Sequence, residues 1–117
     1  MPDESPAREL AQRQLDAYNA HDLTAFAACY HPDVEVRDFP AGTLRFQGLD
    51  ALKARYGPLF QNPRLHAHLV SRTVQGAVAI DTERVEGLRD GEDVSAVAIY
   101  EVEGPTIRRV WFVRERE

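Results

Sequence analysis

The sequence predicts an α+β fold in which three N-terminal helices pack on a strongly curved, mixed but mainly antiparallel sheet. Two observations lead to this prediction. Helical periodicity is confined to about the first half of the chain, and the rest alternates in strands separated by turn residues. The length of 117 residues, 44% of them hydrophobic, suits one domain with one core. Strands of the predicted length twist, so we expect a sheet covered by helices on one side to leave a cavity.

The first helix is predicted to start after Ser5, the expected N-cap, with Pro6 at the first helical position. Residues 1–5 are expected to form a flexible N-terminus of a single domain spanning 1–117. The inward stripe of this helix comprises Ala7, Leu10, Ala11, Leu15 and Tyr18, with Gln14 in its middle. A polar amide therefore faces the core side.

A second, short helix is predicted after Asp22, a good N-cap, and ends at Pro32. Its apolar stripe comprises Leu23, Phe26, Ala27 and Tyr30. The two helices are expected to form a hairpin.

Residues 34–39 alternate with period two and predict a strand in which Val34, Val36 and Asp38 share one face. A short strand near residues 43–47 follows the Pro40-Ala41-Gly42 turn.

The third helix is expected to be capped by Asp50, distorted at Gly57-Pro58 and ended by Pro63. Its inner stripe comprises Leu52, Tyr56, Leu59 and Phe60.

Four long strands complete the predicted sheet, at residues 64–74, 77–88, 93–103 and 106–114. Their connections are Gln75-Gly76, residues 89–92 and Gly104-Pro105. Both faces of residues 94–101 are substantially apolar, so the outer face also needs a cover. A homodimer through the outer sheet face is the simplest cover.

Charge and cysteine content exclude some functions. The formal net charge is −5 and the 14 Lys and Arg are scattered, which argues against a nucleic-acid partner. The N-terminus has no apolar targeting segment and no run approaches 18 apolar residues, so we expect a cytoplasmic protein without membrane contact. Cys29, which has no internal disulfide partner, is expected to be an inert buried thiol.

Several runs of the chain resemble the nuclear-transport-factor-2-like superfamily, in particular ketosteroid isomerases and SnoaL-like polyketide cyclases. The similar runs are residues 18–23, 26–38, 98–102 and 107–112, and the resemblance covers nearly the whole chain in order and spacing. It implies a cone-shaped α+β fold. Because this superfamily includes isomerases, cyclases, dehydratases, hydrolases and noncatalytic binding modules, it implies the fold more strongly than the reaction.

The resemblance also implies site residues. Asp38 matches the general base of ketosteroid isomerases, and Tyr56 matches a tyrosine that supports their oxyanion network. Gln14 stands where those enzymes have their donor tyrosine, and Ala98 stands, within one residue, where they have a protonated aspartic acid. The usual oxyanion donors are therefore missing.

Each of these residues has a structural alternative. Burial at the end of an apolar strand face would disfavour the ionised form of Asp38 and suit a base that removes a proton from carbon. Asp38 could instead accept backbone N–H bonds in the turn. The amide of Gln14 could donate to an oxyanion, or be satisfied within the core.

The expected substrate pocket adds aromatic and polar residues. The superfamily register turns Tyr100 and Trp111 toward the cavity. Arg109 shares the face of Trp111 and could hold a ligand carboxylate or pair with Asp81 or Glu83. The pocket residues are Tyr18, Tyr30, Leu52, Phe60, His68, Tyr100, Arg109 and Trp111. Plain core packing is the alternative for the aromatic walls.

Two pairs of residues share strand faces further along the chain. His66 and His68 could bind a metal, but no third ligand stands at a recognisable spacing. Asp81 and Glu83 could form an acid–base pair, although charge pairs with Arg72 on the preceding strand explain them more simply.

Two functional hypotheses follow. In the first, the chain is an isomerase or cyclase that acts on a small hydrophobic carbonyl compound, with Asp38 as general base and Gln14 or Tyr56 as hydrogen-bond donor. This chemistry requires no cofactor and no metal. In the second, the chain is a noncatalytic ligand-binding or dimerisation module.

Overall fold

The computed structural model describes residues 6–89 and 92–114. The elements are α1 (Pro6–Ala20), α2 (Leu23–Ala27), β1 (Tyr30–Asp38), β2 (Leu44–Gln47), α3 (Leu49–Leu59), β3 (His66–Gln75), β4 (Val78–Arg89), β5 (Glu92–Glu103) and β6 (Thr106–Arg114). The strands form one sheet in the order β2-β1-β6-β5-β4-β3. β1 and β6 are parallel and the other neighbours are antiparallel, so the predicted mixed, mainly antiparallel α+β fold is confirmed.

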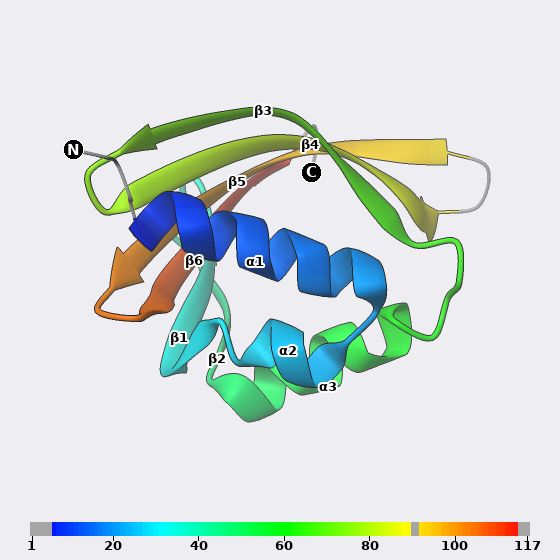
Figure 1. Ribbon diagram of the computed structural model, residues 1–117, viewed down its shortest axis with the longest axis horizontal. Coiled ribbons are helices and arrows are strands. Elements are labelled where there is room, and N and C mark those ends of the chain that lie inside the picture. Colours follow the sequence, from blue (N-terminus) through cyan, green and yellow to red (C-terminus); the bar gives the residue numbers. More distant parts are fainter. Residues whose placement is uncertain (1–5, 90–91, 115–117) are drawn as a thin grey trace.

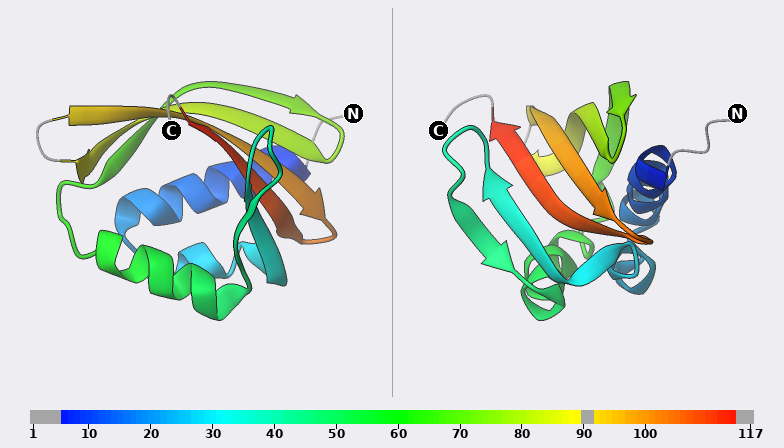
Figure 2. Two further views of the ribbon diagram at one scale, coloured as in Figure 1. Left: turned by 180° about the vertical axis from the view of Figure 1, so that it is seen from behind. Right: turned by 90° about the vertical axis from the view of Figure 1, so that its left-hand side faces the viewer.

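The sheet bends over the helices, as Figure 1 shows. α1 runs beneath β3, β4 and β5, while α2 and α3 lie together beside β1 and β2 (Figures 1 and 2).

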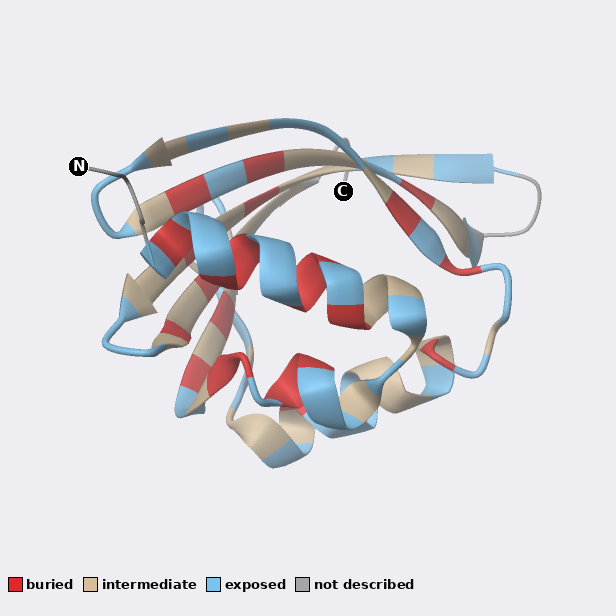
Figure 3. Cartoon of the chain, viewed as in Figure 1, coloured by how far each residue is buried: buried red, intermediate tan, exposed pale blue. Residues whose placement is uncertain are grey.

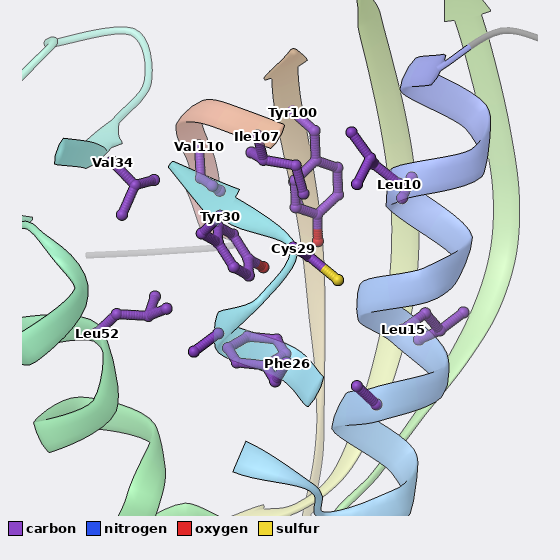
Figure 4. Packing of buried hydrophobic residues seen from close by; sticks show 14 of the residues in the cluster. Leu10, Leu15, Phe26, Cys29, Tyr30, Val34, Leu52, Tyr100, Ile107 and Val110 are labelled. Atoms are coloured by element: carbon purple, nitrogen blue, oxygen red, sulfur yellow. The ribbon is translucent and has the colours of Figure 1, made fainter. Parts of the chain in front are cut away.

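The predicted inner stripe of α1 is confirmed. One side of the helix is buried, as the red segments of α1 in Figure 3 show, and Gln14 is buried with it. The proposed N-cap Ser5 and the flexible stretch 1–5 lie outside the described residues. The core that α1 covers also takes in Phe26, Tyr30 and Ile107 (Figure 4).

The second helix is shorter than predicted. Asp22 is its N-cap and accepts a hydrogen bond from the Ala25 backbone N–H at 3.0 Å, as expected, but the helix ends at Ala27. Cys29 already belongs to the sheet edge, because its carbonyl accepts from the Ile107 N–H at 2.9 Å. Tyr30 therefore projects from β1 rather than from a helix. Pro32 lies inside β1, where pairing with β6 is irregular and no N–H is needed.

The third helix also differs at both ends from the prediction. Gly48, with φ of 94°, is the N-cap, and Asp50 lies in the first turn without capping. The helix contains Pro58 and ends at Leu59, before Pro63, because the N–H groups of Phe60 and Gln61 close it with bonds to Tyr56 and Pro58.

The long strands match their predicted ranges within two residues. In β5, Ala98 and Tyr100 are buried while Val97 and Ile99 are half-buried, so both faces carry apolar surface as expected. Within the described ranges, no helix is long and apolar enough to span a bilayer.

Candidate functional site

A cavity of about 930 Å³ lies between the helices and the concave face of the sheet. Its inner end is formed by buried or half-buried side chains, which include Gln14, Tyr18, Phe26, Tyr30, Glu83 and Tyr100. Its other end, which we call the mouth, carries Asp38 together with the exposed residues Thr43, Arg45, Arg55, Glu92 and Asp93. The cavity thus joins an aromatic interior to a charged rim.

All four tyrosines of the chain line this cavity: Tyr18, Tyr30, Tyr56 and Tyr100. Burial raises the pKa of the Tyr18, Tyr30 and Tyr100 phenols, so these hydroxyls stay neutral and can donate hydrogen bonds. Phe26 packs among them, with ring centroids 5.0 Å from Tyr30 and 4.9 Å from Tyr56. Tyr18, Tyr30, Tyr100 and Leu52 were expected in the pocket, and the structure brings them together there.

Asp38 lies at the mouth, at the last position of β1. Its Oδ2 is 3.3 Å from Arg45 Nη1 on β2, and 27% of its side chain is exposed. Its backbone closes the following turn, because the Asp38 N–H donates to Thr43 at 2.9 Å and its carbonyl accepts from Gly42 at 2.7 Å. The residue therefore belongs both to the turn and to the cavity. The cation beside it was not expected from the sequence.

Gln14 lines the cavity, but its amide is bonded within the protein. Its Nε2 donates to the Ala11 carbonyl at 3.0 Å, and its Oε1 accepts from the Tyr30 hydroxyl at 3.1 Å. The side chain thus links α1 to β1 and holds the Tyr30 ring in place.

Glu83 was not expected to be a pocket residue, yet it lies on the cavity wall. Burial raises the pKa of its carboxyl group to about 7, with a smaller contribution from the neighbouring charge of Asp81. The sequence held a usable signal: Glu83 shares the face of Ala79 and Val85 on β4, both of which are buried. That is the pattern that drew attention to Asp38.

The neighbouring Asp81 forms a cross-strand charge pair with Arg72, as the simpler interpretation predicted. Arg72 Nε and Nη2 lie 2.7 and 3.0 Å from the two carboxylate oxygens, and Asp81 is fully buried. Arg72 Nη1 also donates to Gln12 Oε1 on α1 at 2.8 Å. This pair joins β3, β4 and α1 beside the cavity.

The expectation that Trp111 and Arg109 face the cavity is wrong. Ile107 points into the core, and simple alternation would carry Arg109 and Trp111 to the same side. However, Arg108 is an extra residue between the Val102–Ile107 and Glu101–Arg109 pairs, and this bulge reverses the faces of all later residues. Val110 and Phe112 line the cavity instead.

Arg109 therefore pairs on the outer face rather than with Asp81 or Glu83. Its Nε is 3.2 Å from Glu35 Oε1, and its Nη1 is 3.1 Å from Glu101 Oε1.

His68 and Phe60 also lie outside the cavity lining. His68 is next to Ala67, which faces the cavity, so it projects from the opposite face of β3 and pairs with Glu86. The ring centroids of His66 and His68 are 4.7 Å apart, so the two histidines share a face as expected. Phe60 packs against two residues of the cavity lining, with its ring centroid 5.5 Å from that of Tyr18 and 5.4 Å from that of Phe26. In residues 6–89 and 92–114, no three His, Cys, Asp or Glu side chains cluster as metal ligands would.

Comparison with known proteins identifies a family. The SnoaL-like domain model matches residues 11–110. No curated protein matches the chain.

Solved structures share the fold. An uncharacterised cystatin-fold protein from Novosphingobium aromaticivorans is 25% identical, with a TM-score of 0.83 over 96% of this chain and 100% of that one. A Kribbella flavida protein provisionally named a ketosteroid isomerase is 19% identical, with a TM-score of 0.78 over 96% and 79% of the two chains. A Sinorhizobium meliloti protein provisionally named a polyketide cyclase is 23% identical, with a TM-score of 0.74 over 89% and 93%.

Proposed function

This chain belongs to the SnoaL-like family, and from that premise we propose that it is an isomerase or cyclase that moves a proton on a small hydrophobic carbonyl compound. Asp38 is the general base. It takes the proton from the carbon next to the carbonyl group, and the electron pair of that bond moves to the carbonyl oxygen. Isomerisation follows when the proton returns to another carbon, and cyclisation follows when the enolate carbon attacks a second carbonyl group.

One observation carries this proposal: a carboxylate stands at the mouth of a large cavity whose interior is aromatic and rich in phenols. The apolar walls suit a flat hydrophobic ligand, and the phenols can donate hydrogen bonds to an oxygen that gains negative charge. The names of the Kribbella flavida and Sinorhizobium meliloti proteins support the same two reaction types. The reaction requires no cofactor.

The roles of the two expected donors differ. Tyr56 lines the cavity, and we assign it to the group of phenols that can reach the carbonyl oxygen. Because the amide of Gln14 is bonded to Ala11 and Tyr30, we assign Gln14 the positioning of the Tyr30 ring rather than direct contact with substrate.

A noncatalytic ligand-binding module is the second candidate function. The observation in its favour is the Arg45 guanidinium at 3.3 Å from Asp38, which offsets the negative charge of the carboxylate. In that case the cavity binds the same class of ligand without turnover.

The experiment compares two variants on β1. Proton exchange and turnover of enolisable ketones and lactones are followed by NMR in D₂O with the unaltered chain, Asp38→Asn and Asp33→Asn. Asp33 is exposed on the same strand and serves as the matched control. We expect Asp38→Asn to lose the activity while ligand binding stays intact, and Asp33→Asn to keep both. Turnover that Asp38→Asn leaves unchanged contradicts the assignment of the base, and binding without any exchange supports the second candidate.

A further inference from the structure

The inner end of the cavity contains one carboxyl group that the reaction above does not use. Glu83 projects from β4 between Leu69 of β3 and Ala96 of β5 in the register of the sheet. Within the described parts of the chain, no group donates a hydrogen bond to its carboxyl oxygens. Arg72, whose charge lowers the pKa of Glu83, already directs its nitrogens at Asp81 and Gln12. A buried carboxylate without such partners costs far more free energy than a neutral carboxylic acid in the same place.

Phenols line the same cavity as this carboxyl group, namely Tyr18 of α1, Tyr30 of β1, Tyr56 of α3 and Tyr100 of β5. The charge of Glu83 adds to the burial that raises the pKa of Tyr18, Tyr30 and Tyr100. The Tyr30 hydroxyl is bonded to Gln14, whereas the hydroxyls of Tyr18 and Tyr100 donate to no other described residue. Figure 4 shows the hydroxyls of Tyr30 and Tyr100 among the buried side chains between the sheet and α1.

The charges along the cavity also limit what can bind there. Its lining includes the acids Asp38, Glu83, Glu92 and Asp93 and the bases Arg45 and Arg55, and both bases are exposed residues of the mouth. Arg72, whose charge acts on Glu83 from outside the lining, is already paired with Asp81. An anionic ligand would meet no available cation at the phenol-lined end, whereas a neutral oxygen would meet hydrogen-bond donors.

We propose that Glu83 is the acid of this cavity: as a neutral carboxylic acid it donates a hydrogen bond to the carbonyl oxygen of a neutral ligand, beside the Tyr18 and Tyr100 hydroxyls. This role rests on the proposed function and adds a carboxylic acid to the phenols that donate to the carbonyl oxygen. The substrate class becomes narrower as a result, because neutral ketones and lactones fit and carboxylates do not.

The two carboxyl groups then have different tasks because their surroundings differ. Asp38 lies at the mouth, with Arg45 Nη1 3.3 Å from its Oδ2 and 27% of its side chain exposed. Glu83 lies on the cavity wall that the phenols share, and burial raises its pKa to about 7, so it is protonated in a large share of molecules at neutral pH. When Asp38 removes the proton from carbon, the oxygen gains charge and the Glu83 proton is shared with it or transferred to give the enol. The proton returns to Glu83 when the carbonyl group is restored, so no proton is consumed.

The test uses three small probe ligands that share one ring system and differ in net charge. These are 2-tetralone, which is neutral, tetralin-2-carboxylate, which is anionic, and 2-aminotetralin, which is cationic. Binding is measured by calorimetry at pH 5.5 and pH 8.5. We expect 2-tetralone to bind up to about 30-fold more tightly at pH 5.5, because a group with a pKa of about 7 is only a few per cent protonated at pH 8.5.

Two variants on β4 make the test specific. Glu83→Gln keeps a neutral donor at both pH values, so its affinity for 2-tetralone should no longer depend on pH. Glu86→Gln, whose side chain pairs with His68 on the outer face, should behave like the unaltered chain. If Glu83→Gln does not fold, carboxyl-detected NMR of the unaltered chain replaces it, and 2-tetralone should raise the pKa of Glu83 further.

Three results would overturn the assignment. They are a pH dependence that persists in Glu83→Gln, tighter binding of 2-aminotetralin than of 2-tetralone at pH 5.5, where Glu83 should be protonated, and no binding of 2-tetralone at either pH. The inference and the proposed function can fail separately, since Asp38→Asn should keep the pH-dependent binding even if no substrate is ever turned over.

Discussion

Arg72 binds both carboxylate oxygens of Asp81 across β3 and β4, and Asp81 is fully buried. Such a buried pair is costly to divide, because removal of one partner leaves a charge without compensation. The pair fixes the register of the two strands next to the cavity, since Arg72 and Asp81 are also direct neighbours in the ladder.

We expect Arg72→Met to lower the free energy of unfolding by about 3–5 kcal/mol, because Asp81 loses both of its charged hydrogen bonds. Urea denaturation measures this change. The control is Arg84→Met, which breaks the exposed Arg84–Asp93 pair and should cost about 1 kcal/mol or less. Equal losses in the two variants would show that burial of Asp81 does not matter.

A second prediction concerns the pH dependence of stability. Burial raises the pKa of Glu83 from its ordinary value of 4.5 to about 7 in the folded chain, so the folded state holds this proton more tightly. The free energy of unfolding should therefore fall as the pH rises from about 4.5 through 7, by about 1–3 kcal/mol from this group.

Glu83→Gln removes this titration. Relative to the unaltered chain, the variant should gain stability at pH 8 and gain little at pH 4, which urea denaturation at both pH values would show. A gain of the same size at both pH values would instead mean that Glu83 is ionised throughout or that the substitution acts through packing.

The bend of β4 at Gly87 leads to a third prediction. Gly87 has φ of 88°, and a Cβ atom there would lie 2.8 Å from the backbone of Arg64 and Leu65. The Gly87 carbonyl also accepts from Asn62 Nδ2 at 2.8 Å. We expect Gly87→Ala to cost about 3 kcal/mol or more, because strain and a backbone clash add together.

Gly76→Ala is the matched control for that substitution. Gly76 also has a positive φ, of 58°, but a Cβ atom there would meet open space. Its cost should be about 1–2 kcal/mol, which corresponds to the left-handed conformation alone. Thermal unfolding of both variants tests the difference. A loss of stability in Gly87→Ala no larger than that in Gly76→Ala would mean that the loop at Arg64 moves away freely.

The homodimer expected from the apolar outer face stays a prediction. Ile80 is exposed on that face, and Val97, Ile99 and Trp111 are half-buried there. We expect equilibrium sedimentation at micromolar concentration to show a dimer, and Ile99→Lys to make it a monomer. Thr24→Lys, on the exposed side of α2, should leave the dimer intact. A monomer in the unaltered chain would refute the expectation.

Much of the fold could be predicted because it depends on local patterns. Period two identified the long strands, and the stripe around Gln14 identified the buried side of α1. The errors arose where tertiary pairing overrides local preference. Tyr30 and Pro32 follow a helical stretch, yet the bond between Cys29 and Ile107 draws them into the sheet. No feature of residues 23–32 alone indicates that bond.

The site was harder to predict for the same reason. The extra residue Arg108 reverses the faces of Arg109 and Trp111, and a bulge is set by pairing with β5 rather than by its own sequence. Arg45 reaches Asp38 only because β2 folds back on β1. Glu83, in contrast, could have been chosen from its apolar strand face.

The bulge at Arg108 has a practical consequence for spectroscopy. It turns the only tryptophan of the chain away from the space that all four tyrosines line. Emission excited selectively at Trp111 should respond to association of two chains through the outer sheet, whereas tyrosine emission should respond to occupation of the interior. The unmodified polypeptide therefore contains two separate optical signals, one for assembly and one for ligand.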